Sequence, residues 1–332
     1  LNGLNNTKEF DYNLKGNYQM NVEGNPLLIF ASFDYSQYTD SLVENNRIFF
    51  DLKPRFTYKK ENWQAVLGFN FNIFYSDFNN SRKAILAYSD SINAARFFPH
   101  IEFDYFINPK KLNFYAGITG DVQKNSMLSI SRNNPFINSS NNLNSTINRF
   151  EIKAGLKGNL GSKFGYLIGI QHNTFNNFIL FKSDTTDLRR FVIDHEDLRR
   201  LTFKISMMYH YSEKIRTGVD FNYYRYDLEN QKRPWQLPDF DLKLYANYNI
   251  GNKIIAKANF FVIGPRYSTE IFKNTETQLK TILDFNLGFE YRYSKSFGLF
   301  LDFNNLSAQR YQYWYNYPSF GFNVMGGLIF NL

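Results

Sequence analysis

Apolar and other side chains alternate over residues 320–332, up to the last position of the chain. One set is apolar apart from a glycine and consists of Phe320, Phe322, Val324, Gly326, Leu328, Phe330 and Leu332. Because successive side chains of a β-strand point to opposite faces, this two-residue period predicts a strand with one apolar face. An apolar strand that runs to the C-terminal residue is typical of the last strand of a membrane β-barrel, whose apolar face contacts lipid.

The same period recurs along the whole chain and is clear over residues 8–22, 48–58, 63–73 and 283–293. Polar and charged side chains on one face need water, and the other face cannot also meet water without forming a very large apolar patch. A soluble sandwich would bury that face against a second sheet and would use shorter strands. We therefore predict an all-β fold, a transmembrane antiparallel up-and-down β-barrel with about 15 strands, each with the ~9–11 residues that cross a bilayer.

The connections between the predicted strands alternate between short and long. The short ones carry the Gly, Asn, Pro and Ser of tight turns, and they lie at 23–25, 60–62, 108–110, 161–163, 212–213, 251–252 and 294–296. The long ones are polar and lie at 77–91, 126–145, 181–197, 228–237, 267–277 and 309–317. Outer-membrane barrels combine short periplasmic turns with long extracellular loops, so we expect the long connections on the extracellular side.

This alternation also predicts the direction of the strands. If the last strand ends on the periplasmic side, the first predicted strand, residues 8–22, begins on the extracellular side. Bacterial single-chain barrels usually have an even number of strands, and the chain starts Leu1-Asn2-Gly3 without a signal peptide. We therefore expect residues 1–332 to be a single outer-membrane β-barrel domain, the C-terminal part of a longer barrel whose N-terminal strands and any plug lie upstream.

Composition agrees with a barrel wall. Aromatic residues make up 19% of the chain, yet the mean hydropathy is −0.44, and no stretch approaches the ~20 apolar residues of a spanning helix. With no cysteine, the chain has no disulfide framework and no thiol chemistry. The net charge of +8 fits contact with anionic lipid headgroups or acidic ligands as well as an ordinary solvated surface.

Several motifs resemble one family of barrels. Residues 301–306 (LDFNNL) and then Tyr311, Tyr313, Trp314, Pro318 and Gly321 resemble the end of a TonB-dependent receptor barrel. Further similarity to TonB-dependent-receptor-like barrels of Bacteroidota lies in residues 98–106, 115–117, 134–136, 314–318 and 321–327. The C-terminal end is similar to the signal read by the barrel-assembly machinery, which Gly327, Phe330 and Leu332 match while Met325 stands where a polar residue is expected.

The resemblance implies an integral outer-membrane protein that takes up a ligand, in contact with outer-membrane lipid and lipopolysaccharide and assembled by the barrel-assembly machinery. In this family a plug and a TonB-contacting segment precede the barrel, and the chain shows neither, so a partnership with the TonB system would need an upstream region. The alternative is a non-transporting scaffold subunit of a multi-protein machine for secretion or barrel insertion, which would bind other envelope proteins. No nucleic-acid partner is expected.

Candidate ligand-binding residues are aromatic and lie at the expected outer mouth. They are Trp235, Tyr311, Tyr313, Trp314 and Tyr315. Such rings stack on sugars or aromatic ligands, and they also form the belt at a membrane interface. Tyr317 lies in the same segment.

Catalysis has little support in the sequence, and we predict neither an enzyme nor a cofactor. The four histidines are scattered, without the spacing of metal ligands. The densest acidic group, Asp194, Glu196 and Asp197, offers carboxylate oxygens to Ca²⁺, but nearby arginines could pair with it instead. Charges of both signs alternate on the face expected to line the lumen. They could line a hydrophilic path, hold a plug, or form cross-strand ion pairs that keep the lumen hydrated.

Overall fold

A computed structural model describes residues 8–39, 43–80, 94–109, 111–138, 143–251, 253–270 and 275–330. Its main element is one sheet of 15 strands in which each strand pairs with its neighbours in chain order. The strands are β1 (Lys8–Val22), β2 (Asn25–Thr39), β3 (Val43–Lys59), β4 (Trp63–Asn80), β5 (Ala94–Asn108), β6 (Leu112–Gln123), β7 (Thr146–Leu160), β8 (Phe164–Ser183), β9 (Phe191–His210), β10 (Ile215–Leu228), β11 (Phe240–Ile250), β12 (Ile254–Ile263), β15 (Ile282–Arg292), β16 (Phe297–Asn304) and β19 (Asn323–Phe330).

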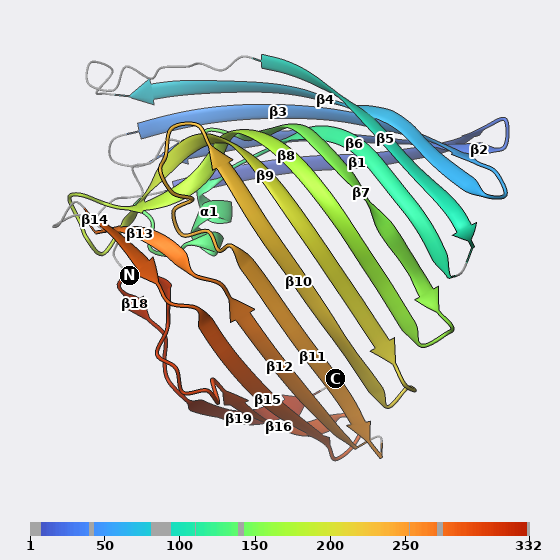
Figure 1. Ribbon diagram of the computed structural model, residues 1–332. Helices are drawn as coiled ribbons and strands as arrows, with labels where there is room; N and C mark the ends of the chain where they lie inside the picture. Colours follow the sequence, from blue (N-terminus) through green and yellow to red (C-terminus); the bar gives the residue numbers. More distant parts are fainter. Residues whose placement is uncertain are drawn as a thin grey trace.

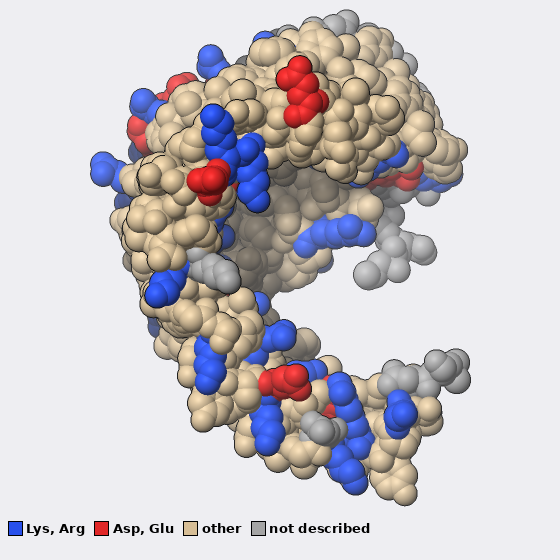
Figure 2. Space-filling view, turned by 90° about the vertical axis from the view of Figure 1, so that its right-hand side faces the viewer, with Lys and Arg blue, Asp and Glu red and all other residues tan. Residues whose placement is uncertain are grey.

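All pairings in this sheet are antiparallel, so the predicted up-and-down order is confirmed. The sheet curves strongly around a hollow (Figures 1 and 2). Two small hairpins, β13 (Arg266–Glu270) with β14 (Thr275–Leu279) and β17 (Gln312–Trp314) with β18 (Tyr317–Pro318), lie in connections at one end. A single helix among the described residues, α1 (Met127–Asn133), follows β6 and lies inside the curve of the sheet (Figure 1).

The two faces of the sheet differ as the sequence predicts. Along β19, Val324, Leu328 and Phe330 are exposed on the convex face, and Phe330 keeps 68% of its surface accessible. The same face of β15 and β16 carries Phe289 opposite Leu301. An apolar belt of this extent is compatible with lipid as its solvent, whereas the polar residues of the other face meet the hollow. No helix in the described part of the chain is long and apolar enough to cross a membrane.

Tight turns close the hairpins at one end of the sheet. Glu23 (φ 50°) and Gly24 (φ 81°) form the turn after β1, and both take the positive φ that a two-residue hairpin turn requires. Gly161 (φ 71°) and Gly251 (φ 59°) also take a positive φ, directly after β7 and β11. The register follows from these turns, with Val22 opposite Asn25 and Lys8 opposite Thr39. Strand β1 therefore begins at the end with the long connections, and β19 ends at the end with the turns, as predicted.

Some long connections are shorter than predicted. The predicted loop at 181–197 is mostly strand, because β8 and β9 pair up to Ser183 opposite Phe191 and leave only 184–190 as a connection. The predicted loop at 267–277 contains the hairpin β13–β14, and 126–145 contains α1. The alternating pattern fades where a strand extends beyond the lipid, since both faces can then be polar. Of the predicted loop at 77–91, residues 77–80 continue β4 and the rest lies outside the described residues.

Candidate functional site

The connection between β6 and β7 folds into the hollow at the end with the long connections, which we call the mouth. We call its residues 124–138 the mouth segment. It starts against β1–β3 and ends against Phe191 of β9, where Ile137 forms a parallel β-bridge. Because five strands lie between β3 and β9 in the sheet order, the segment crosses the mouth from one part of the wall to another.

A buried guanidinium holds both ends of the connection. Arg47 of β3 is 2% exposed and donates to the backbone oxygens of Asn125 and, at 3.4 Å, Leu143. Its other terminal nitrogen donates to Ser36 at 3.0 Å and pairs with Glu9 at 3.3 Å. A buried charge is stable only when it is paired and hydrogen-bonded, and Arg47 has four partners.

Glu9 connects this guanidinium to α1. Its carboxylate accepts from the backbone N–H of Met127 at 2.9 Å and of Leu128 at 2.8 Å. These amides have no partner within the helix, because the first N–H groups of a helix have no helical carbonyl one turn before them. Ser126 caps the same end through Ser129. The start of the mouth segment is thus fixed by side chains from the wall.

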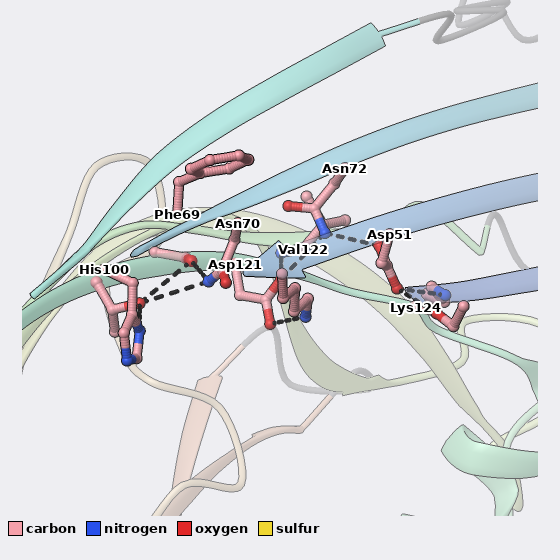
Figure 3. Close-up of polar contacts among 12 residues, drawn as sticks. Asp51, Phe69, Asn70, Asn72, His100, Asp121, Val122 and Lys124 are labelled. Atoms are coloured by element: carbon pink, nitrogen blue, oxygen red, sulfur yellow. Dashed lines mark hydrogen bonds and ion pairs between the residues drawn. The ribbon is translucent and has the colours of Figure 1, made fainter. Parts of the chain in front are cut away.

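Lys124, the first residue of the mouth segment, continues the polar contacts onto the inner wall (Figure 3). It pairs with Asp34 and, at 2.8 Å, with Asp51. Asp51 also accepts hydrogen bonds from Asn72 at 2.7 Å and Ser32 at 2.9 Å. We call Glu9, Asp34, Arg47 and Asp51 the polar anchor.

The polar network extends from the anchor across β4 to β6. Asn72 donates to Asp121, which pairs with Lys53 at 2.5 Å. Asn70 donates to the backbone of Gly120, and His100 lies 3.0 Å from the hydroxyl of Thr119 (Figure 3). Charges of both signs alternate here as predicted, and their cross-strand pairs hold the inner side chains in place.

Aromatic residues from β8, β9 and the segment 312–318 gather at the far end of the mouth segment. Trp314 packs against Phe181 (ring centroids 5.1 Å apart) and Phe191 (5.6 Å). Phe136 stacks on Tyr317 with ring centroids 3.4 Å apart. We call these five residues the aromatic latch. They belong to a buried apolar cluster with Tyr38, Ile130, Ile137 and Leu143.

Backbone and side-chain hydrogen bonds accompany the latch. Asn138 donates its N–H to Phe191 at 2.8 Å, and Phe191 donates to Phe136 at 3.0 Å. The side chain of Asn138 donates to Asp184 at 2.8 Å. Burial alone would raise the pKa of Asp184, but hydrogen bonds from Thr186 and Asn138 outweigh it and lower the pKa below its ordinary value.

The predicted aromatic residues take different positions. Trp314 is buried in the latch, with Tyr315 packed at its edge. The ring of Tyr313, 50% exposed, faces the buried Arg266 at 5.4 Å. Tyr311 donates to Asp284 at 2.5 Å, and burial and this carboxylate raise the pKa of Tyr311.

Trp235 is separate from the latch. Its side chain is buried beside β13, where it donates to Gln231 at 3.1 Å and its backbone bridges Tyr267. The structure thus brings Trp314 and Tyr315 together, places Tyr311 and Tyr313 on the adjoining segment, and leaves Trp235 at another part of the mouth.

Each of the three acidic residues considered for Ca²⁺ contacts a different partner. Asp194 pairs with Lys182 at 2.7 Å, and Glu196 accepts from the N–H of Asn230 at 2.6 Å. Asp197 accepts from the N–H of Asn177 at 2.8 Å. No group of three or more potential metal ligands is gathered among the described residues. The contacts agree with the alternative interpretation, a loop region held by ion pairs and hydrogen bonds.

The proposed C-terminal assembly signal lies on the last strand. Phe330 points outward from β19, and Gly327 lies against the ring of Phe300 on the opposite face. Leu332 lies outside the described residues. Recognition by the assembly machinery stays a prediction.

Sequence reasoning did not identify Arg47 or Phe191 as parts of a site. Arg47 stands in an alternating strand like many other inward charges, and Phe191 lies within a predicted loop. Residues 134–136 (Asn-Pro-Phe) carry only a family resemblance in the sequence, although Phe136 belongs to the latch. Their roles come from contacts between residues far apart in the chain, for which a single sequence carries no signal.

Comparison with solved structures places this fold among outer-membrane receptors. The pyoverdine outer membrane receptor FpvA from Pseudomonas aeruginosa superposes with a TM-score of 0.69 at 13% identity, over 98% of this chain and 53% of that chain. The copper transporter OprC gives 0.67 at 14% identity, covering 98% and 57%. The FrpB iron transporter from Neisseria meningitidis gives 0.71 at 8% identity, covering 98% and 55%.

These likenesses show the fold, which is the β-barrel wall of outer-membrane receptors. The chain spans about half the length of the solved structures that it matches. No family model matches the chain, and no curated protein matches it. The origin in Bacteroidota stays a prediction, since these comparisons do not address it.

Proposed function

We propose that this chain is the barrel portion of a TonB-dependent uptake receptor in the bacterial outer membrane, and that it is not an enzyme. The observation that carries the proposal is that nearly the whole chain superposes on receptors and transporters whose names specify different cargoes, pyoverdine, copper and iron. The apolar convex face supports the location, because acyl chains can cover it. A shared wall with different cargoes favours the mouth as the part of the molecule that selects the ligand.

The mouth supplies suitable groups for a ligand. Tyr313 presents half of its surface, and Tyr311, Trp314 and Tyr315 lie on the same segment. Aromatic rings of this kind stack on flat or apolar ligand surfaces. We propose that these residues, together with Trp235, contact the ligand, and that the TonB system acts through a region upstream of this chain. The comparisons offer no support for the scaffold alternative.

Gene deletion tests this proposal. A deletion strain is grown with iron or copper as the limiting nutrient, and uptake of radioactive iron, supplied as ferric siderophores, and of copper is measured. We expect one of these uptakes to be lost and to return with the native gene, and we expect that ligand to protect residues 309–317 from protease. Unchanged uptake of all of them, together with stable co-purification of other envelope proteins, would favour the scaffold alternative.

A further inference from the structure

Lysines mark the end of the wall at which tight turns join the strands. Each turn from β3–β4 to β15–β16 at this end contains an exposed lysine, and these lysines are Lys60, Lys111, Lys163, Lys214, Lys253 and Lys295. We call these six residues the lysine rim. The same turns contain two acidic residues, Glu61 and Glu213. Figure 2 looks onto this end of the sheet, where Lys and Arg outnumber Asp and Glu.

The connections at the mouth differ, because they carry charges of both signs and pair them. Arg233 pairs with Glu276 at 2.9 Å, and Arg189 pairs with Asp187 at 3.1 Å. At the rim, no carboxylate among the described residues pairs with Lys60, Lys111, Lys163, Lys214 or Lys253. The rim is therefore a row of positive charge that the described wall does not neutralise, and such a row attracts anions.

The rim lies beside the edge of the apolar convex face. Tyr211 and Tyr293, which directly follow β9 and β15, keep 56% and 69% of their surfaces accessible. The ammonium of Lys163 lies 5.0 Å from the ring centre of Tyr211. Exposed aromatic rings at the end of an apolar band mark the membrane interface, so this ammonium stands at the level of the lipid headgroups.

The spacing of the rim also suits lipid. Successive turns are two strands apart, so rim lysines recur roughly every 10 Å around the wall. This is the scale of a single phospholipid headgroup, and the long side chains of two neighbouring lysines can reach one phosphate between them. A phosphate with no amine of its own gains most, because its anionic oxygens accept charge-assisted hydrogen bonds from the protein alone.

We propose that the lysine rim binds the headgroups of anionic phospholipids such as phosphatidylglycerol and so holds the barrel at a fixed depth in the membrane. The proposed location in the outer membrane assigns these lipids to the periplasmic leaflet, because the short turns of such barrels are periplasmic. The inference rests on that location for the leaflet, but its test requires neither uptake nor a transported ligand.

Electron spin resonance of chain-labelled lipids tests the proposal on the full-length protein in phosphatidylcholine vesicles. The spectra compare how strongly labelled phosphatidylglycerol and phosphatidylcholine are held at the protein surface. We expect the native protein to prefer phosphatidylglycerol by roughly fivefold at low salt, which is the contribution of one lysine near an anionic surface. The preference should largely disappear at 1 M salt, where charges are screened beyond about 3 Å.

Matched variants separate the rim from the total charge of the protein. The rim variant combines substitutions in three neighbouring turns, Lys163→Gln, Lys214→Gln and Lys253→Gln. It should lower the preference by about half, because the other rim lysines remain. The control variant removes the same charge from exposed positions at the mouth, with Arg132→Gln, Lys232→Gln and Lys280→Gln. It should keep the native preference.

Arginine at the three substituted rim positions provides a second comparison. It should retain the preference, because a guanidinium also pairs with phosphate. Equal losses in the rim and control variants would overturn the proposal in favour of a general charge effect. A native protein without any preference, or a rim variant that keeps it in full, would also overturn it. If the rim variant loses the preference while gene deletion leaves every uptake unchanged, the lysine rim is supported and the uptake proposal fails.

Discussion

The spanning wall and the mouth are built on different principles. In the wall, β15 and β16 turn Phe289 and Leu301 outward while Asp284 and Asp302 face the hollow. The outward side chains of this pair are exposed, and ladder hydrogen bonds join its strands. At the mouth, Trp314, Phe191 and Ile130 form a buried cluster like the core of a soluble domain.

The difference shows where each region obtains its specificity. A wall strand needs only a two-residue period and a tight turn, and many side chains meet that requirement. The mouth needs particular partners, because its buried charges and rings must each meet complementary groups from distant strands. We therefore expect substitutions at the mouth to act locally and strongly, and most wall substitutions to act weakly.

The largest effect is expected when Arg47 is replaced by Met. The substitution leaves the Glu9 carboxylate and two backbone oxygens without their buried partner, which should lower the free energy of opening at the amides of Met127 and Leu128 by roughly 3–5 kcal/mol. Hydrogen exchange of Met127 and Leu128 measures this. Lys204→Met, at an exposed lysine of β9, is the control and should stay within about 0.5 kcal/mol. Equal effects of the two variants would contradict the contrast between mouth and wall.

A smaller effect is expected at a closely packed glycine in the wall. Gly155 lies against the ring of Tyr115, and a Cβ added there would be 2.2 Å from the backbone oxygen of Ile168. A backbone oxygen cannot move aside as easily as the end of a flexible side chain. Gly155→Ala should therefore lower the free energy of unfolding by about 1–3 kcal/mol. Urea titration of the protein in lipid vesicles tests this, with Gly326→Ala as control, since its nearest contact is 3.5 Å. If Gly326→Ala lowers the free energy of unfolding equally, the close approach to the backbone of Ile168 is not the cause.

The smallest effect concerns pH at the latch. The pKa of Asp184 is lowered in the fold from its ordinary value of 3.8, so its hydrogen bonds contribute full stability above about that pH and lose it as the pH falls through the lowered pKa. Asp184→Ala should therefore speed exchange at Asn138 at pH 6, and the difference from the native protein should shrink toward pH 2. A difference that grows on acidification would contradict this assignment.

The sequence predicted the wall well because its signals are local. Alternation over 283–293 set which face of β15 meets lipid, and Glu23-Gly24 and Gly251 set the turns and with them the register. Prediction was poorer at 181–197, where polar residues suggested a loop and the structure has paired strands. For the site, the sequence identified Trp314 and its neighbours as aromatic residues at the mouth, but not the cluster that buries Trp314.

By itself, the sequence determined the all-β class, the two faces of the wall and the end at which each strand begins, because a period of two and a turn residue act over only a few positions. Tertiary structure alone decided that residues 124–138 cross the mouth, that Arg47 holds them and that Trp314 is enclosed. Those contacts join residues far apart in the chain. They form only when the curvature of the sheet brings the strands together, and no pattern within a single strand specifies that curvature.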